Sequence, residues 1–242
     1  MKLYVVGIGP GNMENMTMKA HRALEDCQVI VGYPVYVDLV KDSYPGKELL
    51  STPMTQEADR CRMAIEEARK GKTVAMVCSG DSGIYGMASL VYELLGEDKD
   101  VEVEVVPGLT AACSGGAVLG APLTHDFAVI SLSDRLTPWE KIEKRLDYAA
   151  QADLSIVIYN PRSHGRPDNL KKACDILLRT LPENRPCGVV RNIGREGQQK
   201  FLLTLKELRD FEADMFCTVF VGNAQTKIIG ENLVTPRGYR DV

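Results

Sequence analysis

The 242-residue chain has little that would place it in a membrane or outside the cell. Its longest uncharged stretch, residues 105–124, contains two prolines and four glycines, which oppose a membrane-spanning helix. The first residues show neither an apolar signal sequence nor an Arg- and Ser-rich leader. We therefore expect no contact with a membrane and a location in the cytoplasm.

Paired cysteines are also missing. The seven cysteines include no Cys-x-x-Cys pair and no spacing typical of a metal site, and most lie in apolar surroundings. An odd number of thiols in a cytoplasmic protein favours reduced, buried cysteines. The sequence therefore predicts neither a disulfide framework nor a protein-bound metal.

An excess of positive charge is absent as well, because the formal net charge is −4. A chain without a basic footprint is not expected to bind nucleic acid. The two halves differ, since residues 1–121 carry 11 Lys and Arg against 17 Asp and Glu, whereas residues 122–242 carry 18 against 16. An anionic ligand would therefore favour the second half.

Hydrophobic residues make up 45% of the chain and charged residues 26%, which is the composition of a globular protein with a buried core. In the first half, helical patterns at 55–69, 83–95 and 110–119 alternate with strands. The strands are predicted from short Val- and Ile-rich runs at 3–8, 29–31, 73–78 and 101–106. This alternation predicts an α/β lobe with a mostly parallel sheet.

The pattern restarts after Pro122, which places a domain boundary near residues 120–126. A strand at 200–205 has no helix before it, which predicts a mixed sheet in this half. The other predicted elements are strands at 127–132, 154–159, 187–191 and 216–221, and helices at 138–150 and 167–181. We therefore predict an α/β protein of two lobes, 1–121 and 122–242, with a ligand cleft between them.

Three turns at strand ends in the first half are rich in small residues: VGIGPG at 6–11, SGDSGIYG at 79–86 and VPGLTAA at 106–112. Because the carboxyl ends of parallel strands meet at one edge of a sheet, these turns outline one ligand surface. The carboxylate of Asp81 either accepts hydrogen bonds from a ligand or caps the following helix. A nicotinamide oxidoreductase is a weaker alternative, because Asn12 stands where a dinucleotide site needs its third glycine.

Polar turns also follow the strands of the second half. Thr137 is placed to cap a helix, which leaves Ser133, Asp134 and Arg135 to face a ligand. The segments concerned are SLSD at 131–134, TPWE at 137–140, YNPRS at 159–163 and VGNAQT at 221–226. Repetition of polar residues at successive strand ends indicates a binding site.

Taken together, these segments resemble the tetrapyrrole methylase family, the class III S-adenosylmethionine-dependent methyltransferases of cobalamin and sirohaem synthesis. The similarity covers nearly the whole chain and includes SGDSGIYGMA at 79–88 and VPGLTAACSGGAVLGAPLTHDF at 106–127. The SLSD, TPWE and YNPRS segments look most like the branch that methylates carbon 17 of a corrin precursor and contracts the ring. The resemblance thus implies conversion of cobalt-factor III or precorrin-3B to the precorrin-4 level in cobalamin biosynthesis.

The resemblance further implies a homodimer, with S-adenosylmethionine in the cleft between the lobes and the tetrapyrrole in an adjacent trough. The VGIGPG turn, through Gly9 and Gly11, would line the tetrapyrrole. The residues that the resemblance places against the methyl donor are Pro10, Gly80, Asp81, Ile84, Thr110, Ala111, Tyr159, Asn160 and Val219.

The expected chemistry needs few conspicuous side chains. A sulfonium methyl group is already activated, so its transfer needs alignment and exclusion of water more than a nucleophile. Substrate carboxylates could pair with the guanidinium groups of Arg135, Arg162 and Arg191. Ring contraction moves protons, and the candidates for this role are His125, Ser133 and Asp134.

Several alternatives stay open at this level. The sequence does not decide whether the macrocycle already holds cobalt when it arrives. A methylase acting at carbon 11 or carbon 20 is the alternative within the family, and SLSD together with YNPRS opposes it. A non-catalytic binding protein would explain two lobes without a catalytic triad, but it would not need polar glycine turns at strand after strand.

Overall fold

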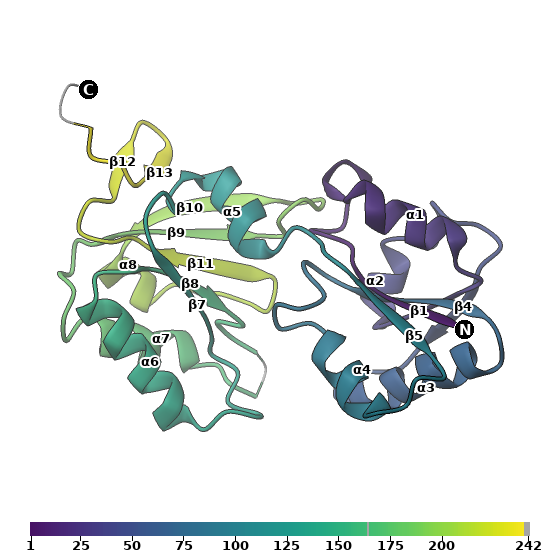
Figure 1. Cartoon of the computed structure of the whole chain (residues 1–242). Helices are drawn as coiled ribbons and strands as arrows, with labels where there is room; N and C mark the ends of the chain where they lie inside the picture. Colours follow the sequence, from purple (N-terminus) through teal and green to yellow (C-terminus); the bar gives the residue numbers. More distant parts are fainter. Residues whose placement is uncertain (164, 240–242) are drawn as a thin grey trace. The chain divides into compact units, whose positions relative to one another are not determined.

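The computed structural model describes residues 1–163 and 165–239. The chain divides into two compact units, Met1–Ala111 and Ala112–Val242. Each unit has its own five-stranded sheet and its own hydrophobic core (Figure 1). The prediction of an α/β fold with two lobes is confirmed.

The first unit is built on a parallel sheet with the strand order β3-β2-β4-β1-β5. Its strands are β1 (Lys2–Gly7), β2 (Val29–Gly32), β3 (Glu48–Ser51), β4 (Thr73–Cys78) and β5 (Glu102–Val106). Because β1 lies between β4 and β5, the turns that follow these three strands are neighbours at the carboxyl edge of the sheet.

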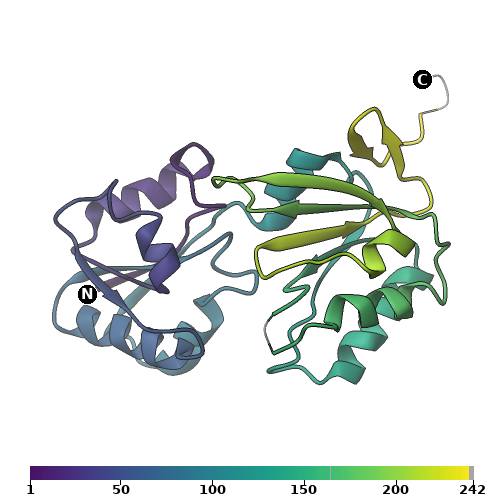
Figure 2. The ribbon, with the colours of Figure 1, turned by 180° about the vertical axis from the view of Figure 1, so that it is seen from behind.

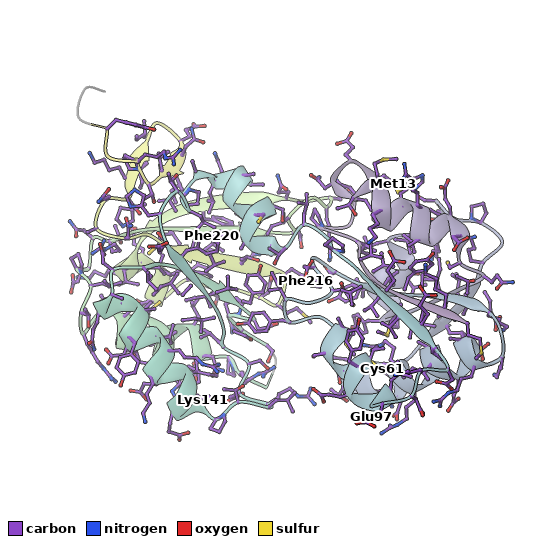
Figure 3. The ribbon with its side chains drawn as sticks, viewed as in Figure 1. Met13, Cys61, Glu97, Lys141, Phe216 and Phe220 are labelled. Carbon is purple, nitrogen blue, oxygen red and sulfur yellow. The ribbon has the colours of Figure 1, made fainter. Side chains whose placement is uncertain are left out.

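Helices cover both faces of this sheet. The elements are η1 (Met13–Asn15), α1 (Met18–Asp26), α2 (Pro34–Asp38), α3 (Glu57–Arg69) and α4 (Ala88–Leu95). Leu3 and Met76 pack with Cys61 of α3 on one face (Figure 3), whereas Val6 packs with Leu24 of α1 on the other. The strands are therefore buried on both sides, which explains their nearly continuous apolar sequences.

Helix α4 begins at Ala88, later than the predicted start at Gly83. The intervening residues form a tight turn, in which the amide of Ala88 donates to the Ser82 carbonyl at 3.0 Å. Gly86 packs so closely on the Ser82 carbonyl that a Cβ would collide with it. The glycines of this segment therefore build a turn before the helix starts.

The second unit has a mixed sheet, as predicted, and its strand order is β10-β9-β11-β8-β7. Only β7 and β8 are parallel, and the other pairs are antiparallel (Figure 2). The strands are β7 (Phe127–Ser131), β8 (Ser155–Tyr159), β9 (Pro186–Arg191), β10 (Gln199–Thr204) and β11 (Cys217–Val221). Its helices are α5 (Ala111–Leu119), α6 (Trp139–Gln151), α7 (Asn169–Leu177) and α8 (Leu205–Arg209).

Alternation along β11 separates the two faces of this sheet. Val219 and Val221 pack in the core formed with α6, α7 and α8. Phe220 points to the other face, where it meets α5 (Figure 3). A Cβ on Gly115 would lie 3.0 Å from the Phe220 ring and 2.9 Å from Ile193, so the helix approaches the sheet only because that side chain is missing.

The domain boundary differs from the predicted one. The sequence places it between 121 and 122, but the division lies between Ala111 and Ala112. Helix α5 packs on the second sheet through its glycines, and β6 (Gly120–Ala121) pairs with β13 (Asn232–Val234) of the same unit. The restart of the sequence pattern after Pro122 marks the next strand and not the start of the unit.

A small sheet with the order β12-β13-β6 includes β12 (Lys227–Ile229) and was not predicted. The VGNAQT segment leads into it as a hydrogen-bonded turn, in which the backbone amide of Asn223 donates to Thr226 Oγ1 at 2.9 Å. Within residues 1–163 and 165–239, no helix is long and apolar enough to cross a membrane.

Candidate functional site

Two glycine turns pair at the carboxyl edge of the first sheet. The Gly9 amide donates to the Gly80 carbonyl at 3.0 Å, and the Gly80 amide donates to the Gly9 carbonyl at 2.8 Å. The third turn lies against both, because a Cβ on Gly7 would be 2.7 Å from the Gly108 nitrogen and 2.8 Å from the Gly80 oxygen. The three turns that the sequence groups into one surface are therefore locked together by backbone contacts.

The carboxylate of Asp81 is occupied by the chain itself. Its Oδ1 accepts hydrogen bonds from the amides of Gly83 at 2.8 Å and Ile84 at 3.0 Å. Its Oδ2 accepts from the amide of Gly108 at 3.0 Å. The interpretation that Asp81 caps the following helix is wrong, because α4 begins only at Ala88 and its N-cap is Met87. Asp81 instead holds the turn that precedes this helix and ties it to the neighbouring turn.

Around this carboxylate the edge exposes apolar groups. Ile84, Tyr85 and Leu109 are among the exposed large hydrophobic side chains. A Cβ on Gly80 would point at the backbone of Thr110 and Ala111, 3.7 Å from the Thr110 Cα atom. The first unit thus brings together the residues predicted to contact the methyl donor from its three turns.

The loop after β1 folds back over Gly9, as the Asn15 carbonyl would lie 2.7 Å from a Cβ there. Pro10, next to Gly9, is buried, and Gly11 is half-buried. Tyr44 supports this loop, with its hydroxyl 3.5 Å from the Met16 sulfur. Burial raises the pKa of Tyr44 to about 12. Sequence analysis did not select Tyr44, because its contact with the loop spans 28 residues.

In the second unit, β7 and β8 end side by side, with Ser131 opposite Tyr159. Asn160 has a φ of 52° and donates from Nδ2 to the Ser131 hydroxyl at 2.8 Å. The Ser133 amide donates to the same oxygen at 3.2 Å. The SLSD and YNPRS segments therefore form one polar cluster at the end of two parallel strands.

Arg166 completes this cluster, and the sequence analysis did not select it for a site. Its Nη1 donates to the Ser133 hydroxyl at 2.6 Å and lies 3.4 Å from Asp134 Oδ1. Its Nε donates to the Ser163 hydroxyl at 2.9 Å. One guanidinium thus links the loop after β7 to the loop after β8.

Tyr159 uses its side chain in a hydrogen bond, whereas the Val219 side chain lies in the core. The Tyr159 hydroxyl accepts a hydrogen bond from the Ala112 amide at 2.7 Å, which satisfies one of the unpaired amides at the start of α5. The Val219 side chain is fully buried in the core. Any ligand contact of Val219 would therefore involve its backbone.

His125 does not join Ser133 and Asp134 in the second unit. It precedes β7, whereas Ser133 and Asp134 follow that strand. A strand rises about 3.3 Å per residue, so the Cα atoms of Phe127 and Ser131 alone are roughly 13 Å apart. The three predicted acid–base candidates are therefore separated into one residue at one end of β7 and two at the other.

The predicted substrate arginines also differ in their surroundings. Arg191 is engaged within its unit, with Nε 2.9 Å from Asp214 Oδ2 and Nη2 donating to the Glu212 carbonyl at 2.9 Å. A hydrogen bond with the Cys217 sulfur raises the pKa of Arg191. In contrast, Arg135 is exposed and Arg162 half-buried, each following one of the two parallel strands.

A family model described as "Tetrapyrrole (Corrin/Porphyrin) Methylases" matches residues 2–209. The chain belongs to the tetrapyrrole methylase family. This confirms the resemblance seen in the sequence, and the protein is a methyltransferase of that family.

Two relatives match the whole length of this methyltransferase. It is 48% identical to a "Probable cobalt-factor III C(17)-methyltransferase" of Salmonella typhimurium, over 98% of this chain and 99% of the relative. It is 38% identical to a "Precorrin-3B C(17)-methyltransferase" of a Sinorhizobium species, over 98% of this chain and 96% of the relative. These names agree with the branch that the sequence segments predicted.

A solved structure agrees with the fold. The crystal structure of the methyltransferase CobJ matches with a TM-score of 0.90 and 37% identity, over 97% of this chain and 99% of that one. The likeness therefore extends over both units. The roles of individual site residues stay predictions.

Proposed function

We propose that the protein transfers a methyl group from S-adenosylmethionine to carbon 17 of a corrin precursor, with ring contraction to the precorrin-4 level, in cobalamin biosynthesis. The observation that carries this proposal is the 48% identity over 98% of the chain to a relative named for cobalt-factor III and carbon 17. The CobJ structure, with its TM-score of 0.90, supports the same branch. A methylase of carbon 11 or carbon 20 is the alternative.

The carboxyl edge of the first sheet fits a methyl donor of this kind. Gly80 has a φ of +69° and carries no Cβ, and a Cβ there would lie 3.7 Å from the Thr110 Cα atom and 3.9 Å from the Ala111 nitrogen. Ile84 and Leu109 add exposed apolar surface. S-adenosylmethionine would supply an activated methyl group, and these residues would bind and orient it and exclude water.

A pair of glycine variants tests this placement. Gly80→Ala adds a methyl group that points at Thr110 and Ala111, whereas Gly71→Ala adds one into open space. Both glycines have positive φ, at +69° and +92°, so both variants carry the same kind of backbone strain. We expect Gly80→Ala to weaken binding of S-adenosylmethionine about tenfold in calorimetry, a difference of about 1.4 kcal/mol, and Gly71→Ala to leave it unchanged. Equal affinities would remove Gly80 from the donor site.

The substrate end of the reaction is assigned to the polar cluster of the second unit. Asp134 is our candidate for proton transfer, because its carboxylate lies at a strand end beside the Ser133 hydroxyl. Arg135 and Arg162 follow the same strand ends and are proposed to hold substrate carboxylates. His125 and Arg191 have less support, because the first lies at the other end of β7 and the second is engaged by Asp214.

The reaction itself is tested by mass spectrometry after anaerobic incubation with S-adenosylmethionine and cobalt-factor III, beside an aerobic reaction with precorrin-3B. A ¹³C-labelled methyl donor then locates the new methyl group by NMR. Gain of one methyl on carbon 17 of the cobalt substrate alone establishes the anaerobic reaction, and gain on precorrin-3B alone establishes the aerobic one. Transfer to carbon 11 or carbon 20, or to neither substrate, overturns the proposal.

We also propose that the enzyme acts in the cytoplasm as a homodimer without a protein-bound metal. Light scattering of the purified protein would then give twice the chain mass of 26.7 kDa. A monomer mass at micromolar concentration would contradict the dimer.

A further inference from the structure

One guanidinium contacts two polar side chains, those of Ser133 and Asp134, that the loop after β7 places at the end of the sheet. Arg166 Nη1 donates to Ser133 Oγ at 2.6 Å and lies 3.4 Å from Asp134 Oδ1. We propose that Arg166 is the positioning residue that presents Ser133 and Asp134 to the substrate. The inference rests on the proposed methyl transfer and ring contraction, and it adds a residue that acts through two others.

Arg166 is itself fixed. Its Nε donates to Ser163 Oγ at 2.9 Å, and its amide donates to the Ser163 carbonyl at 2.9 Å. The Ser163 amide returns a hydrogen bond to the Arg166 carbonyl at 3.4 Å. The planar guanidinium is therefore anchored at its inner nitrogen, and its outer donors point in one direction.

The loop that it holds has few other anchors. The Leu136 side chain is 98% exposed and that of Asp134 is 37% exposed. In the described part of the chain, Arg166 makes the one side-chain hydrogen bond that links residues 134–137 to another element. Without the Arg166 contact, the loop would stay free to move until the substrate binds. The entropy lost on ordering it would then reduce the alignment of the reacting groups.

The contact also decides whether the Ser133 hydroxyl donates or accepts. A guanidinium has donors and no acceptor, so Ser133 Oγ must accept from Arg166. The hydroxyl hydrogen of Ser133 is then directed away from Arg166 as a donor. Beside it, the carboxylate of Asp134 is an acceptor. The cluster thus presents one donor for developing negative charge and one acceptor for a proton, side by side.

Other arginines of the second unit show what a structural pair looks like. Arg209 contacts both oxygens of Asp175 at 2.6 and 3.4 Å and ties α8 to α7. Arg179 pairs with Glu143 at 2.8 Å and ties the turn after α7 to α6 on the surface. Arg166 instead joins two loops at strand ends, through a hydroxyl and a single, longer carboxylate contact.

The test compares Arg166→Ala, Arg166→Lys, Ser133→Ala and the double variant Arg166→Ala/Ser133→Ala with wild type, using Arg179→Ala as the control for loss of a surface guanidinium. The first readout is kcat and KM for the corrin precursor at saturating S-adenosylmethionine. The second is recovery of Arg166→Ala by added guanidinium ion. The third, independent of turnover, is amide hydrogen exchange of the peptide 132–138.

We expect Arg166→Ala to lower kcat about 100-fold, with KM changed less than about threefold, because alignment is lost while binding is kept. Guanidinium ion should raise the kcat of Arg166→Ala at least about tenfold, and the kcat of Arg166→Lys should fall between those of Arg166→Ala and wild type. The double variant should be no slower than Arg166→Ala, because both changes break one unit. Exchange of the peptide 132–138 should accelerate, and Arg179→Ala should behave like wild type.

The inference is overturned if the loss of kcat in the double variant equals the product of the losses in Arg166→Ala and Ser133→Ala. It is also overturned if guanidinium ion does not restore kcat and the loss of kcat follows the melting temperature. If wild type methylates neither corrin precursor, the proposed function fails by itself. The exchange measurement then still decides the position of the loop, since unchanged exchange in Arg166→Ala overturns the role of Arg166 and faster exchange supports it.

Discussion

The Asp81 carboxylate joins two turns of the first sheet, because its Oδ2 accepts a hydrogen bond from the Gly108 amide at 3.0 Å across 27 residues of sequence. The same side chain caps the turn after β4 through the amides of Gly83 and Ile84. Three backbone donors at the proposed donor site thus depend on one carboxylate. Removing it affects the shape of the site before it affects any direct contact with a ligand.

Replacement of Asp81 by alanine should therefore destabilise the protein. It leaves three amides without their charged acceptor, and we expect a loss of about 2–4 kcal/mol in the free energy of unfolding. Chemical denaturation measures this loss, and Asp81→Asn should lose less because one acceptor oxygen remains. Asp59→Ala is the control, since Asp59 pairs with Arg62 on the surface and should cost less than about 1 kcal/mol. A stability of Asp81→Ala equal to that of the control would contradict the tie.

Gly108→Ala should damage the fold through steric overlap. The added Cβ would lie 2.5 Å from the Gly7 carbonyl oxygen and collide with that of Gly80, and both are backbone atoms that cannot rotate away. We expect a loss of about 3 kcal/mol or more, or failure to accumulate as soluble protein. Gly165→Ala places its methyl group in open space and should change the melting temperature little. A well-folded Gly108→Ala protein would show that the three turns are not packed as described.

The thiols should react unequally. Cys113 is exposed, whereas the other six cysteines are buried. Burial raises the pKa of Cys61 to about 12 and that of Cys174 to about 12. We therefore expect one thiol to react rapidly with Ellman's reagent near pH 8 and the rest only after unfolding, because the thiolate is the reactive form. Cys113→Ser should abolish the rapid phase, and two or more rapid thiols in wild type would contradict the burial.

Stability should fall at alkaline pH in a way that depends on Cys78. Burial raises the pKa of this thiol from 9.0 to about 11. The folded protein holds the proton more tightly than the unfolded chain, so this contribution is complete below pH 9 and is lost as the pH rises toward about 11. Between pH 8 and 11, the free energy of unfolding should fall by up to about 3 kcal/mol more in wild type than in Cys78→Ala. Parallel curves for the two proteins would refute the assignment.

The two ends of β7 predict opposite outcomes for two substitutions. Asp134→Asn should lower kcat by about 100-fold or more, because a positioned proton acceptor is lost while the shape of the side chain is kept. His125→Ala should keep kcat within about threefold of wild type, since His125 precedes the strand that Asp134 follows. Steady-state turnover of the corrin precursor measures both. The reverse ranking would move the proton-transfer site to the other end of the strand.

Much of the fold could be predicted because its strands are short, apolar and bounded by glycine or charge. The predicted range 73–78 coincides with β4. No bounds were predicted for helix α1, since its nine residues are mostly charged or small, although the Thr17 side chain that caps it was a readable signal. The boundary was misplaced because the packing of Gly115 on Phe220 joins residues that are distant in sequence.

The site could be predicted in part for the same reason. Ser133 and Asp134 stand out as polar residues directly after a strand. Arg166 does not, because its contact with Ser133 spans 33 residues and arises only when two loops meet. Val219 was placed near a ligand by the resemblance alone, although its side chain faces the core.

The glycine face of α5 has a consequence for recombining this protein with other methylases. A hybrid joined at residue 121 would place the α5 of the other parent against Phe220, where a side chain at the position of Gly115 would collide with the ring. A hybrid joined between Ala111 and Ala112 would keep α5, β6 and β13 in one piece. The glycine that allows a helix to approach a phenylalanine thereby decides where two parental genes can be exchanged without loss of a folded product.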